Sequence, residues 1–216
     1  ETAGRVRKMA NALQNIGVKL GDRIATLAWN GYRHFELYYA ISGIGAVCHT
    51  INPRLSAEQM VYIINHAEDS VICVDLTFVP ILESLKDQIP AEMKFIIMTD
   101  QDHMPDTSLK HVLCYEELLE PCDSNIEWPE FPEETASSLC YTSGTTGNPK
   151  GSLYTHRSTV LHSLTAGISF PETMRAGVRI LPVVPLFHVN AWGLAYVAPL
   201  VGASIIFPGP HLDGKS

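Results

Sequence analysis

Short apolar runs alternate with longer stretches of helical periodicity along most of the chain, and this alternation constrains the fold more than any other feature. In order, the runs and stretches are RIATLAW, YRHFELYYAISGI, GAVCHT, residues 56–66, VICVD, LTFVPILESLKDQI and KFIIMTD. The short runs are typical of buried strands, and the longer ones are typical of helices with one buried face. Their alternation predicts an α/β fold with a mostly parallel sheet, covered by helices on both faces and joined by right-handed crossovers.

Capping residues mark the ends of two predicted helices. Apolar residues recur at helical spacing from Val6 to Ile16, and Gly17 follows where a C-terminal cap belongs. Ser56 is suited to an N-cap, and Glu58 falls in the first turn, where its charge favours the helix dipole. Both helices are therefore explained by local structure without any catalytic role for these residues.

An acidic, proline-containing segment divides the pattern. Residues 116–134 hold eight of the 23 acidic residues and no Lys or Arg, which leaves 15 acidic residues against 15 basic ones elsewhere. Such a segment is typical of a solvated linker. We therefore expect layered sheets in two α/β subdomains, with residues 1–115 before the linker and an incomplete second subdomain in residues 135–216.

The second subdomain repeats the alternation. Its predicted elements are strand SSLCYT, strand or turn SLYT, a helix over residues 156–168, strand VRILPVV, helix AWGLAYVAPLV and strand SIIFP. The seventeen residues 191–207 carry no charge. A membrane helix needs roughly 20 such residues, and Gly193 and Pro199 favour a helix followed by a strand instead.

Composition excludes several classes of function. No basic stripe with interleaved aromatic residues is present in the sequence, which disfavours binding to nucleic acid. The five cysteines are widely spaced without a C-x-x-C pair, which predicts reduced structural thiols and a cytoplasmic protein rather than a zinc site. The chain lacks an initiator Met and opens inside a helical pattern, so we expect a fragment.

The stretch YTSGTTGNPKG at residues 141–151 is the strongest chemical signal. A strand that ends in hydroxyl residues and a glycine-rich turn can direct successive backbone N–H groups into one concavity, which attracts phosphate. Lys150 adds a mobile positive charge that suits a polyphosphate. A flexible surface turn is the alternative. A Walker A loop is excluded, because Pro149 precedes the lysine and Gly151 follows it.

A second candidate segment is PLFHVNAWGL. His188 follows the predicted strand LPVVP, and open α/β sheets place ligands at such strand ends. Trp192 lies four residues later, so the two side chains share one face if a helix begins there. The alternatives are a structural histidine and an ordinary core tryptophan.

The glycine-rich stretch resembles the phosphate-binding signature of the AMP-forming adenylating enzymes, a superfamily that includes acyl-CoA synthetases, firefly luciferase and nonribosomal peptide adenylation domains. The likeness extends over the whole chain. The stretches GDRIATLAWN, GIGAVCHTINPRLSAEQMVYIINHAED and LPVVPLFHVNAWGL are similar to those of medium- and long-chain fatty acyl-CoA synthetases. The resemblance implies part of the large N-terminal domain of such a ligase.

The resemblance implies a two-step reaction with ATP, Mg²⁺ and coenzyme A. A carboxylate attacks the α-phosphorus of ATP and pyrophosphate leaves, after which the thiol of coenzyme A attacks the acyl adenylate. The implied ATP- and phosphate-binding residues are Thr142, Ser143, Gly144, Thr145, Thr146, Gly147, Lys150 and Val189. The family's magnesium contact falls on Thr142.

The resemblance also assigns the acyl side of the site. His188 is the implied catalytic residue, and with Val189 it would shape the junction of the acyl group and the adenylate. A tryptophan at the position of Trp192 gates the acyl tunnel in the long-chain branch, and the neighbouring residues are small or apolar, as a hydrocarbon wall should be: Gly193, Leu194, Ala195, Tyr196 and Val197. Relatives that activate amino acids have an Asp directly after the Phe, whereas His188 follows Phe187 here. A fatty acid or another apolar carboxylic acid is therefore the expected substrate.

Two functions remain open at this point. The first is a fragment of an AMP-forming fatty acid–CoA ligase that is inactive alone, because the family's adenine, ribose and C-terminal lysine contacts lie beyond Ser216. The second is a catalytically silent nucleotide- or acyl-binding module, or a superfamily member that adenylates a different acid. The expected partners are the acid, ATP and coenzyme A, without nucleic acid or a transmembrane segment, and a homodimer is left open.

Overall fold

A seven-stranded sheet forms the centre of the protein. The computed structural model describes residues 1–142 and 148–210. The strands are β1 (Arg23–Leu27), β2 (Val47–Thr50), β3 (Asp69–Val74), β4 (Lys94–Ile97), β5 (Val112–Cys114), β6 (Ala136–Thr142) and β7 (Lys150–Thr155). Their order is β5-β4-β3-β1-β2-β6-β7, and every neighbouring pair is parallel except β6 and β7. The predicted mostly parallel α/β sheet is confirmed.

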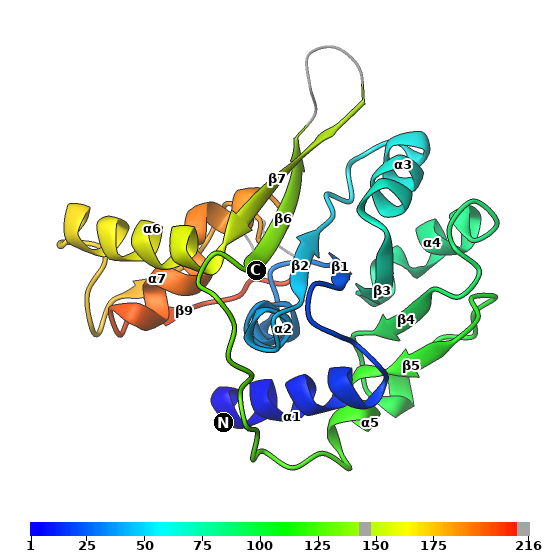
Figure 1. Ribbon diagram of the computed structural model, residues 1–216, viewed down its shortest axis with the longest axis horizontal. Helices are drawn as coiled ribbons and strands as arrows, with labels where there is room; N and C mark the ends of the chain where they lie inside the picture. Colours follow the sequence, from blue (N-terminus) through cyan, green and yellow to red (C-terminus); the bar gives the residue numbers. More distant parts are fainter. Residues whose placement is uncertain (143–147, 211–216) are drawn as a thin grey trace.

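Helices cover both faces of this sheet (Figure 1). The first face carries α1 (Thr2–Asn15), α2 (Tyr32–Gly43) and α5 (Tyr115–Leu119), and the second carries α3 (Ala57–Ala67), α4 (Val79–Leu85) and the short η1 (Leu76–Phe78). A further short helix, η2 (Gln101–His103), connects β4 to β5. The predicted caps are present: Gly17 adopts φ 96°, and Ser56 forms a capping box with Gln59.

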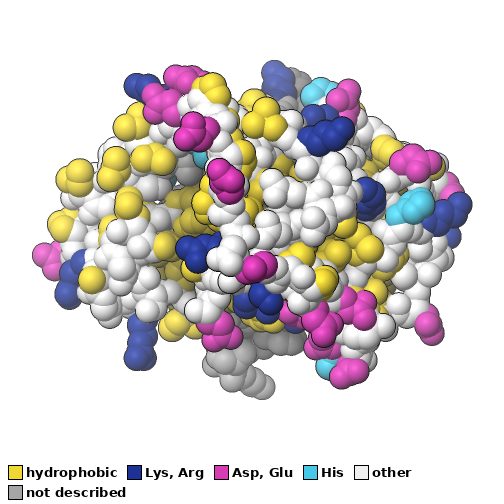
Figure 2. All heavy atoms as spheres, turned by 60° about the horizontal axis from the view of Figure 1, so that its bottom comes forward, with side chains coloured by type: hydrophobic (Ala, Val, Ile, Leu, Met, Phe, Trp, Pro, Cys, Tyr) yellow, Lys and Arg dark blue, Asp and Glu magenta, His cyan; other side chains and the backbone are white. Residues whose placement is uncertain are grey.

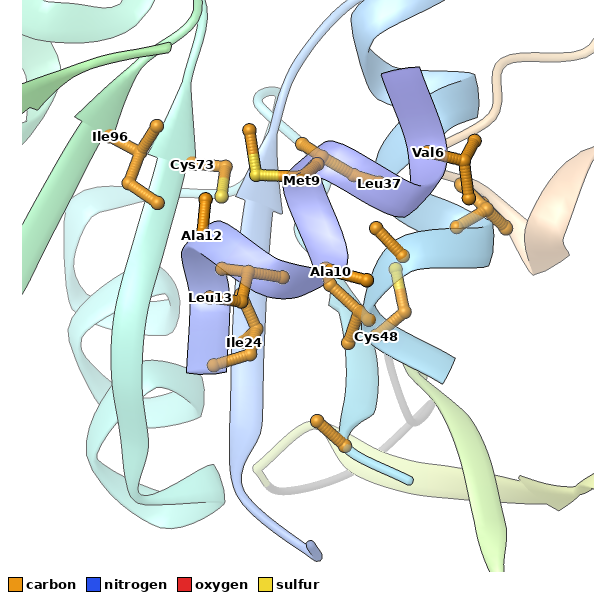
Figure 3. Packing of buried hydrophobic residues seen from close by; sticks show 14 of the residues in the cluster. Val6, Met9, Ala10, Ala12, Leu13, Ile24, Leu37, Cys48, Cys73 and Ile96 are labelled. Carbon is orange, nitrogen blue, oxygen red and sulfur yellow. The ribbon is translucent and has the colours of Figure 1, made fainter. Parts of the chain in front are cut away.

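The core on the first face is built from the apolar stripe of α1. Met9 and Leu13 are fully buried, and they pack with Ile24 of β1 and Leu37 of α2 (Figure 3). Burying a side chain of this size contributes roughly 1.5–3 kcal/mol, so this stripe fixes α1 on the sheet. The periodicity read from the sequence thus corresponds to a real buried face.

The sheet continues across the predicted subdomain boundary, because β6 pairs with β2 through Cys48↔Ser138 and Thr50↔Cys140. The acidic segment also differs from a plain linker at its start. Residues 116–119 belong to α5, and the Glu116 carboxylate accepts hydrogen bonds from Arg5 and Arg33. The division into subdomains itself stays a prediction.

The elements after β7 lie on one side of the antiparallel hairpin that β6 and β7 form (Figure 1). They are α6 (His156–Ser169), β8 (Arg179–Ile180), η3 (Val189–Gly193), α7 (Leu194–Leu200) and β9 (Ser204–Ile205), with β8 parallel to β9. Hydrophobic side chains gather on the side of the molecule where α6 and α7 lie (Figure 2). On α6, Ile168 is 79% exposed and Val160 is 56% exposed. In the described part of the chain, no helix has both the length and the apolar character that a membrane crossing requires.

Two expectations in this region were wrong. The strand predicted over VRILPVV is limited to β8, because Pro182 and Pro185 lack the N–H groups that a ladder needs. The helix predicted over AWGLAYVAPLV begins only at Leu194. His188 and Trp192 therefore do not share a helix face, and His188 does not directly follow a strand.

His34 provides a test of this packing through pH. Its ring is buried on α2, where Nδ1 donates to the Trp29 carbonyl at 3.0 Å and Nε2 accepts from Thr26 Oγ1 at 2.9 Å. Burial lowers the pKa of His34 to about 4. Between pH 4 and pH 6.5 the unfolded chain therefore binds a proton that the folded chain does not, and the free energy of unfolding falls as the pH falls through this window.

The expected contribution of His34 is a loss of about 3 kcal/mol between pH 7 and pH 4. Urea unfolding of the wild type and of His34→Gln at both pH values measures it, because the glutamine does not titrate. The wild type should lose more free energy of unfolding than the variant over this range. Parallel pH curves for the two proteins would contradict the assignment.

Candidate functional site

The β6–β7 hairpin carries the ends of the predicted phosphate loop. Thr142 pairs with Lys150 in the antiparallel ladder, and both residues are exposed. The Thr142 hydroxyl donates to the Lys150 carbonyl over 3.5 Å, a long contact. The hairpin projects from the sheet (Figure 1). The intervening predicted residues, which lie outside the described part of the chain, are Ser143, Gly144, Thr145, Thr146 and Gly147.

The loop end of this hairpin contacts α3 through Tyr141. The Tyr141 hydroxyl, one residue before Thr142, lies 2.6 Å from Nδ1 of His66. The Tyr141 ring also lies 5.1 Å from the buried His49 ring, centroid to centroid. Burial raises the pKa of Tyr141 to about 12, so its hydroxyl stays protonated near neutral pH. These contacts fix the strand from which the loop departs.

A second anchor holds residues 182–186 against the C-terminal end of β1. Asn30 donates through Nδ2 to the Pro182 carbonyl at 3.0 Å and accepts at Oδ1 from the Leu186 backbone N–H at 2.6 Å. The Tyr38 hydroxyl donates to the Leu186 carbonyl at 2.5 Å. Side chains from the first half of the chain thus position the segment that leads into His188. Within the part of the chain that the structure describes, no strand pairing positions these residues.

The backbone after His188 forms a left-handed turn. The φ angles are 48° at Val189, 51° at Asn190, 48° at Ala191, 55° at Trp192 and 77° at Gly193. Each non-glycine residue in this conformation costs roughly 1–2 kcal/mol, so the surrounding structure must hold it. Strain of this kind clusters at functional sites, which favours a functional role for the turn.

Asn190 supplies much of that support. Its amide donates to the Ser138 hydroxyl at 2.9 Å and its Oδ1 accepts from the Cys140 thiol at 3.2 Å, while the Tyr38 hydroxyl oxygen lies 3.2 Å from the same Oδ1. Asn190 itself is buried, and these three partners lie on α2 and β6. Because asparagine tolerates the left-handed region better than most residues, it is well suited to this position.

A cavity of about 420 Å³ lies beside the turn, between α6, α7 and β7. Val189 and Trp192 line it, and the Trp192 side chain is 66% exposed. Nε2 of His162 donates to the Trp192 carbonyl at 3.1 Å. A side chain at Gly193 would place its Cβ 2.7 Å from the His162 ring, so only glycine fits there. The volume is within the range of small-molecule sites.

Sequence reasoning indicated four of the cavity's residues, which are Val189, Trp192, Gly193 and Tyr196, and missed the others. His188 is exposed and is not among the described residues that line the cavity. The lining residues that the sequence did not indicate are Tyr154, Ser158, Thr159, His162 and Asn190. Tyr154 lies on β7, the strand that begins at Lys150, so one strand connects the cavity with the hairpin. For the residues of α6 that line the cavity, the available signal in the sequence was the mixture of polar and apolar residues along this helix.

Within the described residues, no three metal-ligating side chains cluster. The hydroxyl of Thr142 is exposed at the end of β6, and a single protein oxygen of this kind is compatible with Mg²⁺, which usually keeps waters and binds substrate phosphates.

Comparison with known proteins supports one family. Residues 1–216 match the profile of a family described as "AMP-binding enzyme". The chain is 53% identical over 214 residues to a medium-chain-fatty-acid–CoA ligase of Ectopseudomonas oleovorans, with 98% of this chain and 39% of the relative covered. It is 43% identical over 216 residues to a long-chain-fatty-acid–CoA ligase of Thermus thermophilus, with 100% and 38% covered.

A solved structure has the same fold. The anthranilate CoA ligase AuaEII, crystallised with anthranoyl-AMP, superimposes with a TM-score of 0.84 at 25% identity. The match covers 97% of this chain and 39% of that protein. The chain therefore spans about two fifths of the length of the proteins that it matches.

Proposed function

The chain belongs to the AMP-binding enzyme family, and from this membership we propose that it is part of an ATP-dependent, AMP-forming fatty acid–CoA ligase. The observation that carries the proposal is the 53% identity to a medium-chain-fatty-acid–CoA ligase over 98% of the chain. The cavity beside the strained turn supports it, because an acyl group needs such a space. Since the chain spans two fifths of its relatives, the activity is assigned to the longer protein.

In the first proposed step, a carboxylate oxygen attacks the α-phosphorus of ATP, and the bond to the bridging oxygen of pyrophosphate breaks. Lys150 would neutralise charge on the departing phosphates, together with residues 143–147. Fixed donors and charges contribute most where charge develops during the reaction. The exposed position of Lys150 at the start of β7 supports this role, because its ammonium can reach a polyphosphate above the hairpin.

Magnesium is part of this proposal. Mg²⁺ would supply positive charge to the phosphate oxygens when it is bound. The Thr142 hydroxyl would contribute one ligand, and phosphate oxygens and waters the others. The long 3.5 Å contact of this hydroxyl with the Lys150 carbonyl is readily exchanged for a stronger partner.

The acyl group would occupy the cavity between α6 and α7. Val189 and Trp192 line it, so the acyl carbonyl would lie at the left-handed turn and the hydrocarbon would run along the cavity. His188 would act at the junction between the acyl carboxylate and the adenylate. The polarity of the turn and the apolar rings of Trp192 and Tyr196 suit an acid with a hydrocarbon tail.

In the second proposed step, the thiol of coenzyme A attacks the adenylate carbonyl, the acyl–sulfur bond forms, and AMP leaves. Five free, buried cysteines are consistent with a reducing compartment, so a cytoplasmic location belongs to the same proposal. We expect the 216-residue chain by itself to have little or no activity.

The proposal is tested by ATP–pyrophosphate exchange in the full-length protein that contains this chain. The acids should run from acetate through medium- and long-chain fatty acids to aromatic acids. Exchange that depends on a fatty acid is the expected result. Absence of exchange with every acid would favour the catalytically silent binding module instead.

A further inference from the structure

A second cavity lies directly behind the first. It has a volume of about 330 Å³ and is bounded by α2, α6, α7 and the segment around Trp128. Thr159 and Tyr196 line both cavities. Tyr39, Trp128 and Val160 line only the second one, and its surface is mainly apolar, which suits a hydrocarbon. The two spaces are therefore neighbours that meet at two side chains.

Tyr196 is the larger of these side chains, and its ring is held firmly. It packs edge-on against Tyr38 and Tyr39, with ring centroids 5.8 Å and 5.5 Å away. Aromatic pairs in this geometry stabilise one ring orientation. The smaller member, Thr159, is fixed by a contact of 3.2 Å between its hydroxyl and that of Ser137. The boundary between the cavities is thus a packed wall and not a loose side chain.

The hydroxyl of Tyr196 does not explain why the residue is a tyrosine. It is buried and has no hydrogen-bond partner of ordinary geometry among the described residues. No hydrogen bond of ordinary geometry from the described part of the chain therefore fixes this side chain, and its position depends on the packing of its ring. Its contribution is the space that it fills between the cavities.

We propose that Tyr196 determines the acyl chain length of the ligase by closing the acyl cavity, so that the tail of the substrate ends against its ring. The inference rests on the proposed function, and it names Tyr196 as a residue that determines which acids the ligase accepts. With Tyr196 in place, the second cavity lies outside the acyl site. With a small residue there, the hydrocarbon tail of a longer acid would continue into the second cavity, past Thr159 and toward Tyr39 and Trp128.

The test compares kcat/KM for straight-chain acids from butanoate to hexadecanoate in the full-length protein. In Tyr196→Ala, the ratio of kcat/KM for long over medium chains should rise at least tenfold. Each methylene that becomes buried favours binding about fourfold, so two additional methylenes are enough. Tyr196→Val is the second variant, and it should shift the ratio in the same direction.

Two controls separate the size of the ring from other effects. Tyr196→Phe keeps the ring and should keep the wild-type ratio. Trp128→Leu changes a residue that lines only the second cavity, so the ratio should also stay at the wild-type value while Tyr196 closes the partition. Thermal melting establishes that each variant is folded.

The possible outcomes are distinct. A raised ratio in Tyr196→Ala or Tyr196→Val, with both controls unchanged, supports the partition. Folded, active alanine and valine variants with the wild-type ratio would overturn it and leave the ligase function intact. A wild-type protein without any exchange that depends on a fatty acid would overturn the ligase function, and the partition with it.

Discussion

Replacing Lys150 by alanine is expected to lower the rate of ATP–pyrophosphate exchange by the full-length protein by about 10²–10³-fold, the usual loss when one preorganised electrostatic contact to a developing charge is removed. Lys150 opens β7 opposite Thr142, at the end of the hairpin that projects from the sheet. A lysine is a mobile point charge, and the departing pyrophosphate concentrates negative charge at this point of the reaction.

The effect should fall mainly on kcat, because the charge on the leaving phosphates increases in the transition state. Lys110→Ala is the matched control, since this exposed lysine precedes β5 at the opposite edge of the sheet. It should exchange at the wild-type rate. If Lys150→Ala is folded and exchanges as fast as the control, the hairpin does not bind the phosphates as proposed.

Replacing Arg5 by methionine is expected to lower the free energy of unfolding by about 3–5 kcal/mol, because it leaves a buried carboxylate without its cation. The Glu36 side chain is only 1% exposed, and Nε of Arg5 donates to it at 2.7 Å. The same guanidinium donates to both Glu116 oxygens, at 2.9 and 3.0 Å. One side chain of α1 thus joins α2 to α5.

The electrostatics of this cluster favour the charged form of Arg5. Burial by itself lowers the pKa of the guanidinium, but hydrogen bonds and charge from Glu116 and Glu36 outweigh it and raise the pKa above its ordinary value. Tyr115 donates a further hydrogen bond to Glu36 at 2.8 Å. The cluster is therefore satisfied as a unit, and the removal of one member affects the others.

Urea unfolding of the wild type and of Arg5→Met measures this loss. Arg7→Ala, an exposed arginine of the same helix, should stay within about 0.5 kcal/mol of the wild type. Adding Glu36→Gln to Arg5→Met should recover part of the loss, since the buried charge is then removed. If Arg5→Met is as stable as Arg7→Ala, the buried Glu36 carboxylate does not need the Arg5 cation to stay stable in the fold.

The sequence was sufficient to predict the fold in the first half of the chain, where apolar periodicity and capping residues agree. The stripe from Val6 to Leu13 and the Ser56 cap both correspond to observed elements, because local preference and burial favour the same structure. The membership in the AMP-binding enzyme family, suggested by YTSGTTGNPKG, is also confirmed.

The region after residue 181 was harder to predict, because contacts with distant residues override local preference there. Asn30 and Tyr38 hold residues 182–186. Asn190 holds the left-handed turn through partners that lie 50 to 152 positions away in the sequence. A run such as AWGL favours a helix locally, and its residue types do not predict the positive φ angles of Ala191 and Trp192. The roles of the predicted site residues, including His188, stay predictions.

The most direct measurement is a crystal structure of the full-length protein with a non-hydrolysable ATP analogue and a medium-chain fatty acid. The two terminal phosphates should lie beside the β6–β7 hairpin, next to Thr142 and Lys150, with the hydrocarbon chain between α6 and α7 and its end against Tyr196. Terminal phosphates bound away from this hairpin, or a hydrocarbon chain outside the cavity lined by Val189 and Trp192, would contradict the account.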